Sequence, residues 1–162
     1  MQKLRERTQV WEDVVVQPGQ NLLSECQSDV FEIECEIKLD EAREIGFKVR
    51  KSDKEETIVG YNVNSKTLFV DRCRSGESAF HTEFACKHDA QVELQNGRIK
   101  LHLFVDQASI EVFANDGEVT VTDQIFPDLA STGLEFYVME GMARVISLKL
   151  YKLMSAYSTN AV

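Results

Sequence analysis

The chain has 162 residues, a length typical of one domain built around a single hydrophobic core. Its 43% hydrophobic and 28% charged residues exclude a disordered or fibrous chain. The net charge of -9 argues against nucleic acid as a partner, because phosphate contacts need clustered Lys and Arg. No run approaches the roughly 18 apolar residues that cross a bilayer, so no membrane partner is expected. The polar N-terminus, MQKLRERTQVWED, shows no signal-peptide pattern.

Apolar and polar residues alternate with a period of two along much of the chain. In residues 31–39, FEIECEIKL, apolar side chains occupy every second position and charged ones lie between them. Because side chains alternate between the two faces of a strand, this segment is predicted to be a strand with one buried and one exposed face. Further strands are predicted at residues 45–50, 57–62, 67–71, 92–94, 98–106, 109–114, 119–124, 133–139 and 145–152.

Tight turns separate these strands. Asn96-Gly97 and Asp116-Gly117 supply the positive φ angles that short hairpin loops require. Many short antiparallel strands predict a sandwich or a barrel, and the alternation favours two sheets that each expose one face. The predicted fold class is therefore all-β, a two-sheet antiparallel β-sandwich. We expect one domain over residues 1–154, followed by a loose tail at residues 155–162.

The four cysteines are too few for a disulfide scaffold in a chain of this length. Cys35 falls on the apolar side of its strand, so a buried free thiol is the favoured interpretation. A disulfide between Cys26 and Cys35 is the alternative.

A second group of thiols and imidazoles raises the question of zinc: Cys73, His81, Cys86 and His88. Structural zinc sites usually contain two pairs of ligands, each pair closely spaced in the sequence. Only Cys86 and His88 are close, and they lie closer together than the usual pair. No metal site is therefore expected.

Two carboxylates, Asp106 and Glu111, flank a short connection between predicted strands. One interpretation is a catalytic pair. The favoured one is that Asp106 accepts hydrogen bonds from the turn backbone and from Ser109, as aspartate commonly does in turns.

Residues 105–127, VDQASIEVFANDGEVTVTDQIFP, resemble a signature of the C-terminal β-sandwich module of glycoside hydrolase family 32. That family contains invertases, levanases and inulinases, which hydrolyse β-fructosides. Leu4-Arg5 and the segment Val70-Asp71-Arg72 with Ser75-Gly76 also match, so the resemblance covers nearly the whole chain. The chain departs from the family at Gln107, where an arginine is common, and at Cys73. The resemblance implies structural roles for Asp71, Arg72, Asp106, Ser109, Glu111, Phe113, Asn115, Asp116, Gly117, Phe126 and Pro127.

The resemblance also implies a concanavalin-like, lectin-like jelly-roll arrangement of the two sheets. Residues 1–10 resemble the linker from an N-terminal five-bladed propeller, which carries the catalytic Asp, Glu and Asp of the family. Two of the three catalytic motifs contain Asp-Pro. This sequence has no Asp-Pro, because its two prolines, Pro18 and Pro127, follow Gln17 and Phe126. Glu34-Cys35 matches the third motif, Glu-Cys, but the other two catalytic motifs do not accompany it. We therefore expect no catalytic, cofactor-binding or metal-binding residue in this chain.

By this resemblance the chain is a non-catalytic accessory module of a retaining hydrolase that acts on sucrose or fructans. Its expected partner is the propeller, whose stability, assembly or substrate access it would influence; a homodimer stays open. The compartment is extracellular or periplasmic if the parent degrades fructans, and cytoplasmic if it is a sucrose-type hydrolase.

The alternative is a lectin-like module that binds fructan or another carbohydrate. Its candidate stacking platforms are Phe104, Phe113 and Tyr61, with Trp11 and Tyr151 as further aromatic residues. Exposed aromatic residues mark an interface without identifying the partner, and a protein interface is the favoured interpretation.

Overall fold

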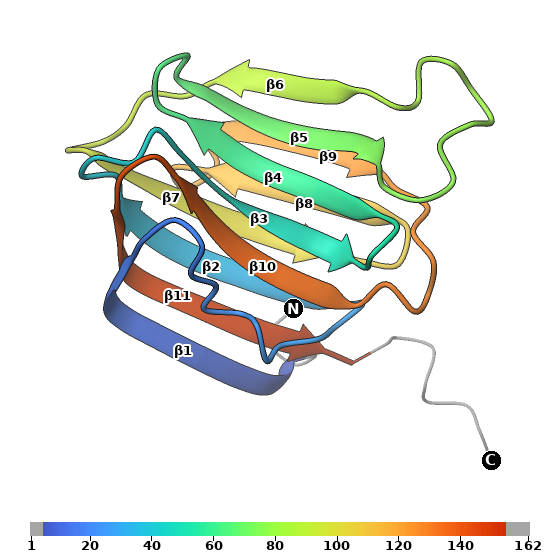
Figure 1. Cartoon of the computed structure of the whole chain (residues 1–162), viewed down its shortest axis with the longest axis horizontal. Coiled ribbons are helices and arrows are strands. Elements are labelled where there is room, and N and C mark those ends of the chain that lie inside the picture. Colours follow the sequence, from blue (N-terminus) through green and yellow to red (C-terminus); the bar gives the residue numbers. More distant parts are fainter. Residues whose placement is uncertain (1–4, 155–162) are drawn as a thin grey trace.

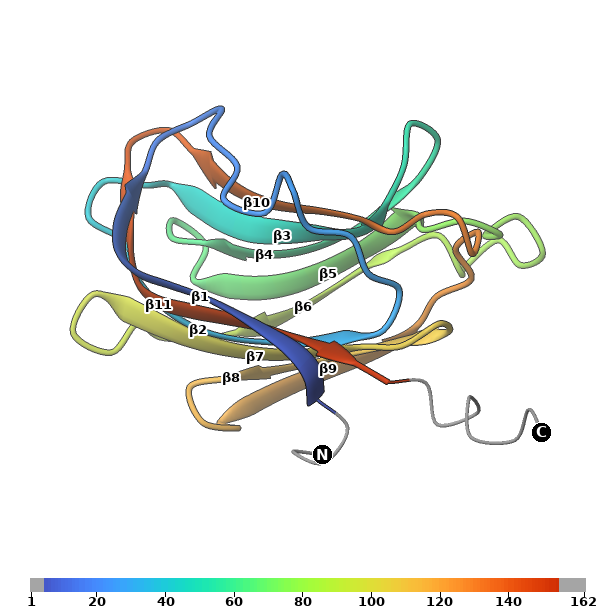
Figure 2. The same ribbon diagram turned by 90° about the horizontal axis from the view of Figure 1, so that it is seen from below.

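The computed structural model describes residues 5–154 as a sandwich of two antiparallel sheets (Figures 1 and 2). The six-stranded sheet has the order β1 (Arg5–Val16), β11 (Ala143–Leu153), β2 (Phe31–Lys38), β7 (Arg98–Val105), β8 (Ser109–Ala114) and β9 (Val119–Gln124). The five-stranded sheet has the order β10 (Gly133–Met139), β3 (Glu44–Lys51), β4 (Glu56–Asn62), β5 (Thr67–Arg74) and β6 (Lys87–Gln91). The predicted all-β sandwich is confirmed.

The alternating sequence pattern places the core between the two sheets. Ile33 on β2 pairs with Leu103 on β7, and both side chains are fully buried. From the other sheet, the rings of Phe47 and Phe136 pack with their centroids 5.2 Å apart. Burying each such side chain contributes roughly 1.5–3 kcal/mol. Over residues 5–154, no helix is long and apolar enough to cross a bilayer.

Both predicted hairpin turns adopt left-handed backbone conformations. Asn96 and Gly97 have φ angles of 55° and 73°. Asn115, Asp116 and Gly117 have φ angles of 48°, 62° and 88°, in the loop between β8 and β9. The Asn-Gly and Asp-Gly patterns therefore located these turns correctly.

The structure corrects the expected strand at residues 92–94. The strand is β6, Lys87–Gln91, whose residues KHDAQ are almost all exposed and show no apolar alternation. β6 forms an edge of the five-stranded sheet, where a polar strand is tolerated because no second neighbour covers it. Val92 follows it, buried, and its carbonyl accepts a hydrogen bond from Tyr61.

β1 is a strand for which the alternation gave no signal. Its 12 residues pair with β11 at the edge of the six-stranded sheet, and they include residues 5–10 of the segment that resembles a linker. Most of its side chains are charged or exposed, so no buried face is visible in the sequence. Trp11 and Val14 alone among its half-buried residues pack against the core. The expected tail at residues 155–162 lies outside the described residues.

Arg50, at the end of β3, has a guanidinium buried inside the sandwich. Its Nε donates to the carbonyl of Ser131 at 2.8 Å, and its two terminal nitrogens donate to the carbonyls of Gln107 at 3.2 Å and Asp128 at 3.1 Å. Burial lowers the pKa of Arg50, and nearby acidic groups oppose that change. One side chain thus joins β3 to the β7–β8 loop and to the β9–β10 connection.

We expect Arg50→Ala to lower the free energy of unfolding by about 3 kcal/mol or more, because the buried Ser131 and two loop residues lose the donor to their carbonyls at once. Urea titration followed by tryptophan fluorescence would measure the change. Arg43→Ala is the control, because the Arg43–Glu140 ion pair is largely exposed and should contribute less than about 1 kcal/mol. Equal losses in the two variants would contradict this role for Arg50.

Candidate functional site: the outer face of the six-stranded sheet

The face of the six-stranded sheet that points away from the core carries a shallow groove of about 590 Å³. β2, β7, β8 and β11 contribute its walls. We call it the outer-face groove, and its lining includes the side chains of Glu34, Glu36, Lys100, His102, Phe104, Phe113, Asp116 and Lys149. The groove therefore combines aromatic rings with charges of both signs.

Three rings cluster in this groove. The rings of His102 and Phe104 lie 4.4 Å apart between centroids, and Phe113 packs edge-on against Phe104 at 6.0 Å. All three residues are half-buried, because they occupy the outward phase of β7 and β8. The structure thus brings together the two phenylalanines that the sequence proposed as stacking candidates.

Tyr61 is a wrong candidate for sugar stacking. Its side chain is fully buried in the core, and its hydroxyl donates to the carbonyl of Val92 at 2.7 Å. Trp11 is half-buried against the core, and Tyr151 is only 7% exposed. These rings therefore contribute to packing between elements of the sandwich.

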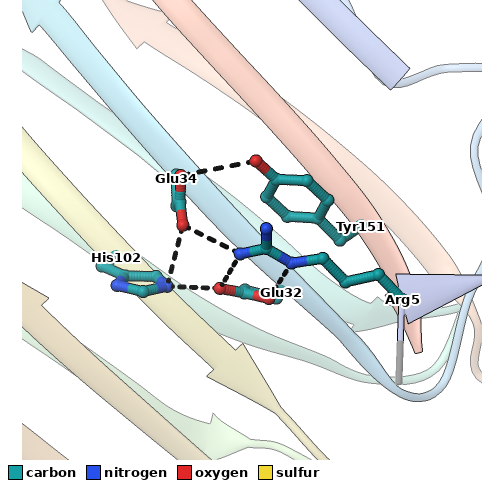
Figure 3. Close-up of polar contacts among 5 residues, drawn as sticks. All are labelled: Arg5, Glu32, Glu34, His102 and Tyr151. Atoms are coloured by element: carbon teal, nitrogen blue, oxygen red, sulfur yellow. Dashed lines mark hydrogen bonds and ion pairs between the residues drawn. The ribbon is translucent and has the colours of Figure 1, made fainter. Parts of the chain in front are cut away.

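A polar network of five residues from four adjacent strands shares Glu34 and His102 with the groove (Figure 3). Arg5 on β1 donates to both carboxylate oxygens of Glu32, at 3.0 and 2.8 Å, and to Glu34 at 3.0 Å. His102 Nε2 lies 2.7 Å from Glu32 Oε1, and it is the donor because an ionised carboxylate only accepts. The Arg5 guanidinium also stacks over the ring of Tyr151 at 3.6 Å.

Glu32 is almost completely buried within this network. Burial alone raises the pKa of its carboxyl, but hydrogen bonds from Arg5 and His102 outweigh that effect and leave the pKa below its usual value. The hydrogen bond to Glu32 in turn raises the pKa of Arg5. Glu32 is therefore an anion that ties β1, β2 and β7 together.

Ligand atoms of Glu32, Glu34 and His102 lie within 4.8 Å of one another, as they do in metal sites. Here the guanidinium of Arg5 already occupies the position of a cation, because it donates to both carboxylates. The two carboxylates are also close enough to suggest a glycosidase pair, which needs one carboxyl that keeps its proton. The lowered pKa of Glu32 opposes that role for Glu32, and Arg5 donates to both carboxylates, so the arrangement fits an ion-pair network.

Comparison with known proteins assigns the chain to a family. The profile described as "Glycosyl hydrolases family 32 C terminal" matches residues 1–152. The chain belongs to this family. It is similar to a levanase of Bacillus sp. (strain L7), with 43% identity over 83% of the chain and 15% of the relative. It is also similar to the levanase of Bacillus subtilis (strain 168), with 38% identity over 98% of the chain and 24% of the relative.

Solved structures agree with this assignment. The fold resembles part of an exo-inulinase from Aspergillus awamori, with a TM-score of 0.81 and 25% sequence identity over 94% of this chain and 30% of that chain. The chain spans about a quarter or less of the length of the two levanases. It therefore corresponds to the C-terminal module of family 32 enzymes, as the sequence motifs predicted.

The signature residues of the family make contacts between elements of the sandwich. Asn115 accepts a hydrogen bond from the backbone of Lys100 at 3.2 Å and donates to the carbonyl of Glu93 at 3.0 Å. It thereby joins the β8–β9 hairpin to β7 and to the segment before β7. Asp116, beside it, lines the groove and pairs with Lys100 at 3.3 Å.

A second set of signature residues joins β5 to β9. Asp71 caps the backbone of Cys73 at 2.9 Å, and Arg72 donates to the carbonyl of Gln124 at 3.0 Å. Gly76, with a φ of 101°, forms an isolated bridge with Phe126, where a Cβ would collide with the Phe126 carbonyl. These close approaches explain why Ser75-Gly76 and Phe126-Pro127 accompany each other in the motif.

Asp106 and Glu111, which flank the β7–β8 connection, are solvent-exposed, and neither lines the groove. Asp106 accepts a hydrogen bond from the backbone of Gln107 at 2.6 Å, as expected for an aspartate in a turn. The expected hydrogen bond from Ser109 to Asp106 is wrong in direction, because the Asp106 amide donates to the carbonyl of Ser109 at 2.9 Å. Glu111 pairs across the sheet with Phe104. Gln107 contacts Asp29 at 3.4 Å through its side-chain amide.

The cysteines are all free, so the alternative disulfide between Cys26 and Cys35 is excluded. Burial raises the pKa of Cys35 to about 12, so this thiol stays protonated and packs in the core as predicted. Of the four residues considered for zinc, the structure brings together only Cys86 and His88, at 3.4 Å. Cys73 is exposed on β5, and His81 bonds to the backbone of Glu83.

The Arg5–Glu32–His102 network was not foreseen from the sequence. Glu32 falls in the phase of β2 that alternation assigns to solvent, and nothing in its neighbours marks it as buried. The network requires β1, β2 and β7 to be near one another, and sheet order is not encoded in local alternation. Arg5 within the Leu4-Arg5 motif was the one available signal.

The network makes stability depend on pH. Because the pKa of Glu32 is lower in the folded state than its unfolded value of about 4.5, the unfolded chain binds more protons as the pH falls through this range. The free energy of unfolding should therefore decline as the pH falls below about 4.5, and Glu32→Gln should flatten that decline. Urea titrations at successive pH values would measure both slopes.

Glu111→Gln is the matched control, because it neutralises an exposed carboxylate on the same sheet face outside the network. We expect this variant to keep the slope of the parent chain. A Glu32→Gln variant with the parental slope would show that the buried ion pair does not control acid stability.

Proposed function

We propose that this chain is the non-catalytic C-terminal module of a β-fructosidase, and that it stabilises the catalytic propeller and shapes its assembly or substrate access. The observation that carries the proposal is the anchoring of β1. Arg5, at the start of the described chain, is bound by two carboxylates and by the ring of Tyr151.

This anchoring gives a preceding domain a fixed point of attachment. β1 pairs with β11 from Arg5 opposite Leu153 to Val16 opposite Ala143. A domain joined through residues before Arg5 would therefore meet a rigid edge of the sandwich. The similar levanases, of which this chain spans 15% and 24%, support a longer parent that acts on fructans.

The chemistry of the described residues agrees with an accessory role. Arg5 binds both Glu32 and Glu34, and the pKa of Glu32 is lowered where a general acid needs it raised. The sequence also lacks the Asp-Pro pairs of two catalytic motifs of the family. Catalysis is thus assigned to the propeller of the parent, which would be a retaining hydrolase of sucrose or fructans.

We expect the purified chain to release no fructose from sucrose, levan or inulin. Fructose release would be measured enzymatically, and titration calorimetry on the same preparation would measure binding of levan and inulin. Hydrolysis by the pure chain that is lost in Glu34→Gln would overturn the accessory role. Saturable binding without hydrolysis would favour the second candidate function below.

The second candidate function is fructan binding in the outer-face groove. The half-buried rings of Phe104 and Phe113 offer apolar surface for the C–H faces of a sugar, and the charged side chains around them can bond hydroxyls. An apolar surface with a few convergent polar groups is the usual composition of a small-ligand site.

If the groove binds fructan, the double variant Phe104→Ala, Phe113→Ala should weaken levan binding by about tenfold or more, because it removes both ring surfaces. Calorimetry would measure the affinity, and circular dichroism would verify folding. Phe80→Ala is the control, because Phe80 is 61% exposed and lies outside the groove. An equal loss in this control would exclude the groove as the binding site.

A further inference from the structure

A thiol, an imidazole and a carboxylate lie in a row where β5, β6 and β9 meet, away from the outer-face groove. Cys86 Sγ lies 3.4 Å from His88 Nε2, and His88 Nδ1 lies 2.6 Å from Asp123 Oδ1. The carboxylate fixes the tautomer, because an ionised oxygen accepts the proton of Nδ1 and leaves Nε2 free to accept one from the thiol. This order of groups is the one that activates nucleophilic cysteines.

Arg72 adds a positive charge to the same sulfur. Its Nε and one terminal nitrogen each lie 3.4 Å from Cys86 Sγ, so two N–H groups of the guanidinium donate to the sulfur. The same side chain stacks over the ring of Phe84 at 4.0 Å and lies 3.7 Å from Asp123. Because Arg72 is only 13% exposed, its charge acts on the sulfur with little screening by water.

The buried carboxylate provides an independent observation. The side chain of Asp123 is only 3% exposed, and within residues 5–154 its Oδ2 is one of two buried side-chain atoms without a hydrogen-bond partner. A buried anion with an unpaired oxygen is costly unless positive charge lies nearby. Arg72 supplies such a charge at 3.7 Å from Asp123, and the contact with Asp123 holds the His88 ring with Nε2 toward the thiol.

We propose that Cys86 is a modification site that reacts with low-molecular-weight disulfides to form a mixed disulfide. The thiol proton passes to His88 Nε2, and the Cys86 sulfur attacks one sulfur of the disulfide. A new S–S bond forms as the old one breaks, and the departing thiolate takes the proton from His88. The disulfide is the oxidant, and one small thiol is released for each Cys86 modified.

Cys73 makes the proposal testable, because it is the more exposed thiol in the same region. The Asp71 carboxylate beside the thiol, together with burial, raises the pKa of Cys73, and the described residues place no imidazole beside it. Exposure alone therefore predicts that Cys73 reacts first, whereas the geometry predicts that Cys86 does. Cys26 and Cys35 are buried and serve as unreactive references in the folded chain.

The experiment compares Cys73→Ser with Cys86→Ser in the full chain at neutral pH. An aromatic disulfide that releases a coloured thiolate gives the rates, and intact mass after incubation with oxidised glutathione identifies the adduct. We expect Cys86 in the Cys73→Ser variant to react about tenfold faster than Cys73 in the Cys86→Ser variant. Equal rates, or a faster reaction at Cys73, would overturn the proposal.

Three positioning variants separate activation from structural damage. In the Cys73→Ser background, His88→Asn, Asp123→Asn and Arg72→Lys should each slow the reaction at neutral pH and move the rise of the pH–rate profile to higher pH. Arg72 from β5 and His88 from β6 face the sulfur, and Asp123 from β9 contacts both of them. Variants that lower the thermal midpoint but keep the parental pH–rate profile would show that the cluster serves packing alone.

Discussion

The buried guanidinium of Arg50 is the interaction on which the arrangement of the loops depends. Arg50 lies at the end of β3 in the five-stranded sheet, and its guanidinium donates to backbone carbonyls of the β7–β8 loop and of the β9–β10 connection. Ser131 is buried, and leaving its carbonyl without a donor would be costly. The Arg50 guanidinium donates to the carbonyls of three loop residues and thereby links the two sheets at one end of the sandwich.

The family signature follows from constraints of this kind. Gln107 and Asp128 beside the signature residues supply carbonyls to Arg50, Asn115 joins the β8–β9 hairpin to β7, and Gly76 permits the approach of Phe126. None of these positions requires chemistry on a sugar. The motif therefore identifies the fold and the family, while the outer-face groove and the Cys86 cluster involve residues that the motif explains only in part.

Local alternation was sufficient for most strands, because each exposes one face to water and buries the other. It failed for β6 and for β1, which are edge strands with mostly exposed side chains. The outward phase of Phe104 and Phe113 could be predicted, but the burial of Tyr61 and Glu32 could not. Both depend on which strands are neighbours, and on contacts between residues far apart in the chain.

The position of β11 has a consequence for synthesis on the ribosome. β11 lies between β1 and β2, so within residues 5–154 the first two strands pair with the last one and not with each other (Figure 1). Until residues 143–153 have left the exit tunnel, both N-terminal strands present open backbone edges. The six-stranded sheet can therefore close only after β11 has been synthesised, and until then the open edges of β1 and β2 favour aggregation of the nascent chain.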